Sequence, residues 1–306
     1  MAITLEDLRG DRRRIRTERA VRLVLTAAAG TSILISALIV FSLARETWTY
    51  VTQVEWATVL SSDGWFPRRG EYNIWTVLVG SGIVTVVAMV IALPVGLGSA
   101  IYLSEYARPT VRKVLKPTLE ILAGIPSVVL GFFAISFISP EIVQRFFGAT
   151  DLFNLMAAGL GVGILSIPLI ASVSEDALRS VPDALREASY GMGARKITTT
   201  VKIVLPAAVS GLVAAAILAV SRAIGETMVV FIAGGAGGGT LFNTNPLEPG
   251  LTMTAAMASQ ATGTDAVVGE ALTFQSLFFV GSVLFLITFA LNVIASRFVR
   301  RVRQSY

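Results

Sequence analysis

Ser174–Pro206, SEDALRSVPDALREASYGMGARKITTTVKIVLP, is the longest polar interruption in the second half of an otherwise apolar sequence. It carries five Lys or Arg residues and ends at Pro206, where the apolar sequence resumes. The chain has 306 residues, of which 54% are hydrophobic and 15% charged, a composition far from that of a soluble domain. We therefore expect the polar stretch to be a loop between membrane-spanning helices.

Six apolar stretches are long enough to cross a bilayer core, which needs roughly 20 residues per helix. The predicted fold class is accordingly an all-α membrane protein with six transmembrane helices. We divide the chain into a basic tail at 1–22, a first span with an outside segment at 23–73, a five-helix core at 74–296 and a basic end at 297–306. The spans are predicted at 23–44, 74–103, 118–139, 153–173, 207–233 and 271–296.

Lys and Arg residues are concentrated in alternate connecting segments. The tail 1–22 carries seven, the segment 104–117 four, the segment 174–206 five and the C-terminal end four. Because positive residues are retained on the cytoplasmic side, both termini and the two basic loops are predicted to be cytoplasmic in a multi-pass protein of the cell membrane. The few cations on the other side are Arg45, Arg68, Arg69 and Arg145.

The same charge distribution bears on partners. The pI near 9.8 follows from topology, so nucleic-acid binding is not indicated. The basic tail is interpreted as a topology anchor, and the alternative is a short interfacial helix whose arginines meet anionic membrane lipid. Loop 104–117 is interpreted as a solvated, lipid-facing basic face. In the outside segment 45–73, aromatic residues such as Trp48, Tyr50 and Trp65 are expected to form a belt at headgroup level.

Several chemistries are disfavoured. The chain has no Cys and no His, which removes thiolate ligands and the commonest general base and metal ligand. Gly234–Thr240, GGAGGGT, lacks the lysine of a phosphate-binding loop and is expected to be a flexible linker. We therefore do not expect hydrolytic or metal chemistry, and we predict no metal or cofactor for this chain.

Proline and glycine interrupt several of the predicted spans. Pro94 lies in the second span, Gly124–Pro126 in the third and Gly159–Gly163 in the fourth. Such residues suit helices that line a pathway, where neighbouring groups or water satisfy the freed backbone. They also suit close helix packing, and the sequence leaves both interpretations open.

A short amphipathic helix is predicted inside the polar loop. Pro182 suits a helix start and is followed by an acidic first turn. Leu185, Ala188 and Met192 recur at helical spacing as one apolar stripe, and Gly193 supplies a stop. Such a helix can lie on a membrane or fit a groove on a partner protein, and periodicity alone does not choose. The β-branched segment that follows has neutral helix propensity at best, and topology favours a helix there.

The residues of the loop resemble the EAA loop of ABC-importer permeases, EAA-x3-G-x9-I-x-LP, with a serine in place of the second alanine. The resemblance implies a type I ABC importer permease fold. It also implies that the loop docks on a separate ATPase dimer, which binds ATP and Mg. The residues that match the motif, and would make the coupling contact, are Glu187, Ala188, Ser189, Gly193, Ile203, Leu205 and Pro206.

A second resemblance concerns the cargo. The run RAIGET at 222–227, continued by Met-Val-Val, is similar to that of phosphate-importer permeases and is closer to the PstC type than to its PstA-type sister. The resemblance covers nearly the whole chain. It implies import of inorganic phosphate, with a PstA-like second permease chain and an external phosphate-binding protein as further partners.

Charges within the fifth predicted span support an anion pathway on physical grounds. Arg222 lies sixteen residues after Pro206, or about 24 Å along a helix, where an unpaired charge is costly. Glu226 stands four residues later, which would place the two side chains on one helix face. They form either a private ion pair or a site in which Arg222 presents its guanidinium to an oxyanion, beside Glu226 and Thr227.

Other functions remain as alternatives. The alternatives within the same class are a PstA-type sister subunit and a permease for another oxyanion such as phosphonate or sulfate. From another class, an ATP-independent secondary transporter would need inverted repeats or a series of ionisable groups along the pathway, and neither is evident. The third alternative is a membrane enzyme, and the absence of His, Cys and any nucleophile motif argues against it.

Overall fold

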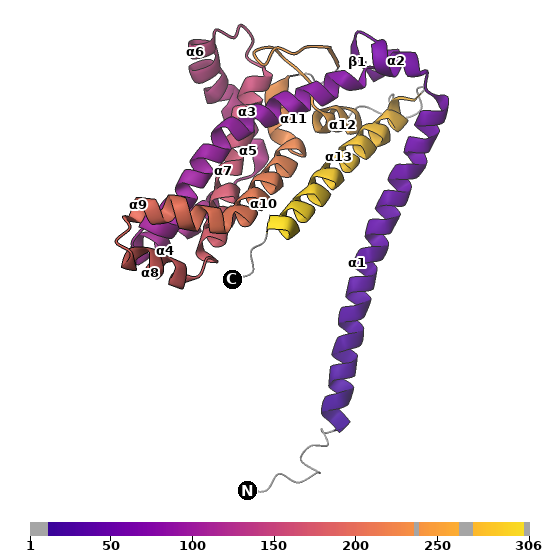
Figure 1. Ribbon diagram of the computed structural model, residues 1–306. Coiled ribbons are helices and arrows are strands. Elements are labelled where there is room, and N and C mark those ends of the chain that lie inside the picture. The colour runs from indigo at the N-terminus through magenta and orange to yellow at the C-terminus, as the bar shows by residue number, and fades with distance from the viewer. Residues whose placement is uncertain (1–11, 236–238, 263–271, 303–306) are drawn as a thin grey trace.

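A computed structural model describes residues 12–235, 239–262 and 272–302 and is almost entirely helical (Figure 1). Within those residues, six helical segments are long and apolar enough to cross a membrane, which confirms the predicted fold class and number of spans. The six segments are Thr17–Gln53, Ile74–Tyr106, Ser127–Phe147, Leu155–Arg179, Lys196–Ile224 and Thr273–Val299.

The elements follow one another with short connections. The α-helices are α1 (Arg12–Gln53), α2 (Trp56–Ser61), α3 (Ile74–Ile101), α4 (Pro109–Leu122), α5 (Ser127–Phe133), α6 (Arg145–Phe147), α7 (Leu155–Arg179), α8 (Asp183–Gly191), α9 (Lys196–Thr199), α10 (Leu205–Ile224), α11 (Met228–Gly234), α12 (Met253–Ala261) and α13 (Thr273–Val302). Wider helical turns with i to i+5 hydrogen bonds are η2 (Tyr102–Tyr106), η3 (Ala134–Gln144) and η4 (Thr200–Val204), and a tighter 3-10 turn is η1 (Pro67–Arg69). The strands are β1 (Gly64–Phe66), β2 (Glu71–Tyr72) and β3 (Thr240–Leu241).

The core is built on close packing of α3 against α7. A Cβ atom at Gly159 would lie 2.7 Å from the side chain of Val87, and one at Gly163 would lie 3.0 Å from the Ala88 carbonyl oxygen. Both distances are too short for an alanine without a shift. The glycines at these two positions of α7 therefore serve helix packing, which decides between the two interpretations of them.

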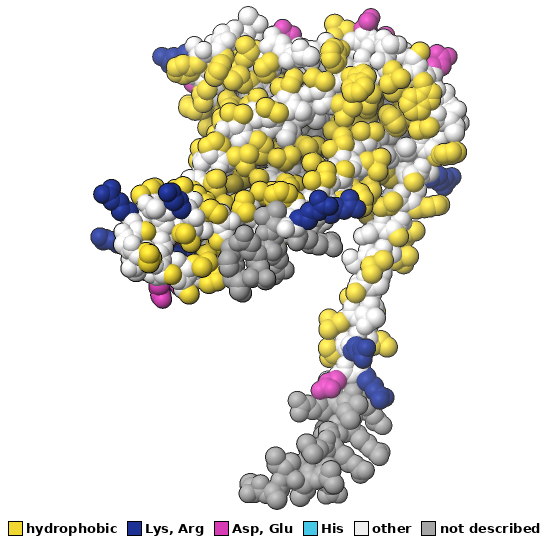
Figure 2. Space-filling model, in the orientation of Figure 1, with side chains coloured by type: hydrophobic (Ala, Val, Ile, Leu, Met, Phe, Trp, Pro, Cys, Tyr) yellow, Lys and Arg dark blue, Asp and Glu magenta, His cyan; other side chains and the backbone are white. Residues whose placement is uncertain are grey.

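The molecule has two distinct ends. Helices α4, α8 and α9 lie together at one end, which we call the basic end (residues 104–122 and 174–204), and β1, β2 and α2 lie at the other, the sheet end (Figure 1). The start of α1 and the end of α13 point toward the side of the basic end. Hydrophobic side chains cover the visible surface between the two ends, and Lys and Arg side chains gather near the basic end (Figure 2).

The sheet end joins segments far apart in the sequence. Its three short strands are ordered β2-β1-β3, and both pairs are antiparallel, with Trp65 opposite Tyr72 on one side and Thr240 on the other. Trp65 and Tyr50 are fully buried, and the Tyr50 ring stacks on Phe279 with the centroids 4.8 Å apart. The predicted aromatic belt is wrong for these two residues, because they form the core of a folded cap.

Helix α1 stands largely apart from the rest of the chain (Figure 1). It ends at Gln53 rather than at residue 44, and its side chains from 17 to 42 are exposed. Near the sheet end, the Thr47 hydroxyl donates to the Phe278 carbonyl oxygen at 2.9 Å and lies 2.7 Å from the Ser282 hydroxyl of α13. The attachment of α1 is therefore confined to the part near the sheet end.

Two predicted spans are divided by breaks. A turn at 123–126 separates the amphipathic α4 from α5, so the third span begins at Ser127 rather than at residue 118. A break at 225–227 separates α10 from α11, so the predicted span 207–233 consists of two helices. In contrast, the segment from Lys196 to Val204 is helical and continuous with α10, as topology predicted.

The glycine-rich stretch after α11 is not a simple linker. Gly235 has a φ of +80°, and a side chain there would collide with the Phe153 ring. Gly239, with φ +115°, packs against Trp65 and Phe66. The expectation of a flexible linker is therefore wrong for these two glycines, while residues 236–238 lie outside the described part of the chain.

Candidate functional site

The predicted helix of the polar loop is present as α8. Pro182 immediately precedes its first residue, and its C-terminus is closed by a left-handed turn at Gly193, where φ is +78°. The Gly193 N–H donates to the Tyr190 carbonyl at 2.9 Å, and the Ala194 N–H donates to the Ser189 carbonyl at 3.1 Å. This pair of bonds is the Schellman motif, which favours glycine at that position.

The two faces of α8 have different surroundings. Leu185 packs inward against a buried cluster that includes Leu178 and Val181. Ala188 is exposed, and Met192 is 88% exposed. The predicted single apolar stripe is therefore wrong, because its first member faces the protein and the other two face away. The outward face, with Glu187, is available to a partner.

The serine that departs from the motif makes a contact of its own. The Ser189 hydroxyl lies 2.8 Å from the Thr199 hydroxyl, and Thr199 is fully buried. An alanine would leave this hydrogen bond unmade. The substitution therefore adds a link between α8 and α9.

The end of the motif forms the junction between the loop and the fifth span. Ile203 and Leu205 are half-buried on either side of the fully buried Val204. Pro206 lies in the first turn of α10, where the lack of a backbone N–H is best tolerated. The helix widens at η4 just before this proline, so the junction remains helical without a regular α-helical turn.

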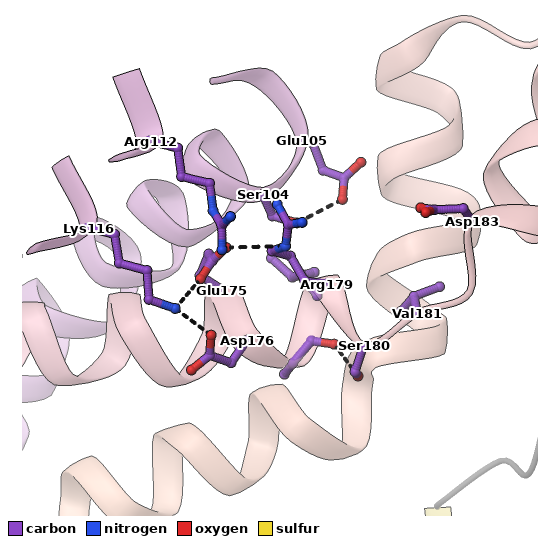
Figure 3. A network of polar contacts seen from close by, with 12 residues as sticks. Ser104, Glu105, Arg112, Lys116, Glu175, Asp176, Arg179, Ser180, Val181 and Asp183 are labelled. Carbon is purple, nitrogen blue, oxygen red and sulfur yellow. Dashed lines mark hydrogen bonds and ion pairs between the residues drawn. The ribbon is translucent and has the colours of Figure 1, made fainter. Parts of the chain in front are cut away.

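A buried carboxylate anchors loop 104–117 to the fourth span. The side chain of Glu175 on α7 is completely shielded, and its oxygens lie 2.7 Å from Arg112 Nη2 and 2.7 Å from Lys116 Nζ, both on α4 (Figure 3). Lys116 also pairs with Asp176. The expectation that this basic loop is merely solvated is therefore wrong for these two cations.

Burial and ion pairing shift the pKa of Lys116 in opposite directions. Burial lowers the pKa of Lys116, but its bonds to Asp176 and Glu175 outweigh burial and raise it above the usual value. The ammonium group therefore stays charged through neutral pH, and the pairing is lost only as the pH rises through the raised pKa.

A second buried carboxylate holds α8. The Glu105 side chain, on η2 at the end of the second span, lies 3.0 Å from Arg186 Nη2. Arg186 also donates to the carbonyl oxygens of Leu178 at 2.9 Å and Val181 at 2.7 Å. Sequence reasoning missed both buried carboxylates, and the available signal was an acid placed beside each basic loop, where a span ends.

The residues predicted to line the pathway lie at the break in the fifth span. Arg222 lies exposed in the last turn of α10, and Glu226 and Thr227 lie in the break before α11. Because the helix ends at Ile224, the expected neighbourhood of Arg222 and Glu226 on one helix face is not formed. Among the described residues, no hydrogen bond or ion pair engages the Arg222 guanidinium.

The adjacent start of α12 is closed by the protein itself. The Met253 N–H donates to the Ser81 hydroxyl at 2.9 Å, and the Thr252 hydroxyl accepts from the Ala255 N–H at 3.3 Å. The Thr254 hydroxyl donates to the backbone carbonyl of Glu226 at 2.7 Å, which fixes the break against α12.

The described residues also contain no group of three acidic side chains that would suit a metal ion.

Comparison with known proteins points to transport subunits. The phosphate transport system permease protein PstC of Mesorhizobium japonicum is 31% identical over 262 residues, covering 79% of this chain and 78% of the relative. The phosphate transport system permease protein PstA 1 of Mycobacterium tuberculosis is 36% identical over 186 residues, covering 60% of this chain and 58% of the relative.

Solved structures support the same fold. A structure of the MetNI methionine ABC transporter aligns with a TM-score of 0.55 at 22% identity, over 76% of this chain and 94% of the matched chain. The fold is therefore that of a type I ABC importer permease. The family model described as binding-protein-dependent transport system inner membrane component matches residues 92–304. The chain thus belongs to the family of binding-protein-dependent transport system inner membrane components.

Proposed function

We propose that the chain is the transmembrane permease subunit of an ATP-driven importer of inorganic phosphate. Family membership supports a transport role, and the PstC relative, similar over most of the chain, is a phosphate transport permease. The observation that carries the proposal is the exposed Arg222 guanidinium, without a partner in the described part of the chain, beside a break in an apolar span.

Arg222 has the chemistry to receive an oxyanion. Its planar fork of N–H donors matches the geometry of phosphate oxygens, and a charge at membrane depth must be met by water, an anion or another charge. Glu226 and Thr227 lie within the break itself. A nearby carboxylate weakens the hold on the anion, which favours release during transport.

The polar loop would link the permease to ATP hydrolysis. We propose that the outward face of α8 docks on a separate ATPase dimer, which binds ATP and Mg, so this chain needs no cofactor. Exposure of Glu187, Ala188 and Met192 supports this role. The basic end then faces the cytoplasm, a PstA-like chain forms the other half of the pathway, and an external phosphate-binding protein delivers the anion at the sheet end.

Uptake of labelled phosphate tests the proposal. Vesicles containing the co-purified complex should accumulate phosphate only with ATP and the binding protein, and excess sulfate or phosphonate should not compete. Competition by either anion would assign the chain to a different oxyanion importer. Uptake that does not require ATP would instead support a secondary transporter.

The similarity to PstA 1 favours one second candidate, in which the chain is the PstA-type half of the same importer. Pairwise co-expression separates the two assignments. A PstC-type chain should assemble with a PstA-type partner and the ATPase. Assembly with a PstC-type partner instead would make this chain the PstA-type subunit.

A further inference from the structure

Arg186 connects α8 to two membrane-spanning helices. Its side chain is 13% exposed, and Nη2 lies 3.0 Å from Glu105 Oε1, at the end of the segment that continues α3. It also donates to the carbonyls of Leu178, in the last turn of α7, and Val181, in the linker that follows. One side chain thus joins α8 to both spans.

The contacts suit arginine in particular. The last carbonyls of a helix have no partner within the helix, and Arg186 supplies donors to the end of α7 while pairing with Glu105. A lysine presents a single ammonium group and cannot reproduce the planar fork. Because the Glu105 side chain is almost fully buried, removing Arg186 would leave its carboxylate with only the Ser104 hydroxyl as a hydrogen-bond donor among the described residues.

The two spans that Arg186 joins form one unit. Helices α3 and α7 pack closely through Gly96, where a Cβ would lie 2.7 Å from Ile170, and through Gly159. Helix α4 is tied to the same unit by the pairs of Arg112 and Lys116 with Glu175. A displacement delivered to this unit at Arg186 would therefore move three elements together.

We propose that Arg186 is a positioning residue that transmits movement of α8 to α3 and α7. The inference rests on the proposed function, in which the outward face of α8 docks on the ATPase. Glu187 and Ala188 face away from the protein while Arg186 faces it, so the helix connects the docking face with the spans. Without Arg186, α8 would tilt on its two linkers, and its movement would not be transmitted to α3 and α7.

Transport stoichiometry tests the role. In vesicles containing the full complex, Arg186→Met and Glu105→Gln should each retain the ATPase subunit and hydrolyse ATP. Phosphate transported per ATP should fall at least tenfold, a change of about 1.4 kcal/mol in coupling, and Arg186→Lys should recover part of it. The control is Arg108→Met, since Arg108 is exposed and has no side-chain partner in the described part of the chain. An unchanged ratio in Arg186→Met would overturn the proposal.

A distance measurement tests the attachment without phosphate. The chain has no native cysteine, so spin labels can be placed at Ala184→Cys on α8 and Val95→Cys on α3, both exposed. Their distance should not change between the nucleotide-free and ATP-trapped complex, and Arg186→Met should broaden or shift it. If the distance changes with nucleotide as much in the chain with Arg186 as in Arg186→Met, the attachment is refuted. If this test succeeds while the unmodified complex imports no phosphate, the cargo assignment fails and the role of Arg186 stands.

Discussion

The Ser189 hydroxyl lies 2.8 Å from the Thr199 hydroxyl, and the bond joins α8 to α9 across the left-handed turn at Gly193. Serine at this position is where the chain departs from the EAA pattern. The hydroxyl group that this serine introduces is hydrogen-bonded to the buried hydroxyl of Thr199. The polar loop is therefore held by an internal hydrogen bond as well as by the contacts of Arg186.

Replacement of Ser189 with alanine should remove this internal hydrogen bond. Thr199 keeps only a long bond to the Arg195 carbonyl, at 3.4 Å, so the loss should be about 1 kcal/mol. Thermal unfolding of the detergent-purified chain measures it. In Thr199→Val the bond is already absent, so adding Ser189→Ala should have little further effect. A full additional loss in the double variant would rule out the bond as the cause.

Neutralising Glu175 should be far more damaging than neutralising an exposed acid. Glu175→Gln leaves Arg112 and Lys116 without their shared carboxylate, and breaking a buried pair costs about 3–5 kcal/mol. Glu141→Gln is the matched control, because its pair with Arg145 is long and exposed and contributes about 0–1 kcal/mol. Unfolding temperatures of the two variants give the comparison. Equal shifts would contradict the structural role of Glu175.

Adding one methyl group at Gly159 should disrupt the α3–α7 contact. A Cβ there meets Val87 at 2.7 Å, and overpacking of this kind costs about 1–3 kcal/mol. Gly82→Ala on α3 is the control, because nothing lies within 4 Å of a Cβ at that position and alanine favours the helix. Heat stability should fall for the first variant and hold or rise for the second. A stable Gly159→Ala would argue against close packing at this crossing.

Arg222 should be required for transport but not for assembly. Arg222→Gln removes the cation near the break, so phosphate uptake should be lost while the ATPase subunit still co-purifies. Arg222→Lys keeps the charge without the fork and should transport at a reduced rate. Uptake and co-purification are measured on the same preparations. Normal uptake by the glutamine variant would remove Arg222 from the pathway.

Gly193 should separate two effects of a side chain at the turn. Its φ of +78° disfavours most residues, by roughly 1–2 kcal/mol, yet the surrounding space is open. Gly193→Asn tolerates the left-handed conformation and should keep the ATPase bound. Gly193→Glu adds strain and a charge beside the docking face and should release it. Co-purification with the glutamate variant at the unmodified level would contradict the docking role.

Local sequence patterns predicted what depends on local forces. Span number follows from the length of apolar runs, and α8 follows from Pro182, an acidic first turn and Gly193. The same patterns could not predict partners distant in sequence. Arg186 meets Glu105, and Arg112 meets Glu175, only after separate spans have packed.

The break in the fifth span was missed for a related reason. Arg222 and Glu226 have the spacing of helix neighbours, and the apolar sequence continues past them. In the structure the Thr254 hydroxyl of α12 donates to the Glu226 carbonyl within the break, a contact between residues far apart in sequence that a local pattern does not reveal. The strands of the sheet end were missed because two or three residues cannot show an alternating pattern.

The pairing of β1 with β3 sets an order on biosynthesis. Gly64 and Trp65 of β1 can pair with Leu241 and Thr240 of β3 only after β3 has been synthesised. The second to fifth spans lie between these two strands in the sequence. A two-stranded hairpin alone is marginally stable, so the early strands gain their third partner only after the fifth span has been synthesised. Chains truncated before Thr240 would leave the sheet end unclosed, so protease resistance there would report that the ribosome has passed the fifth span.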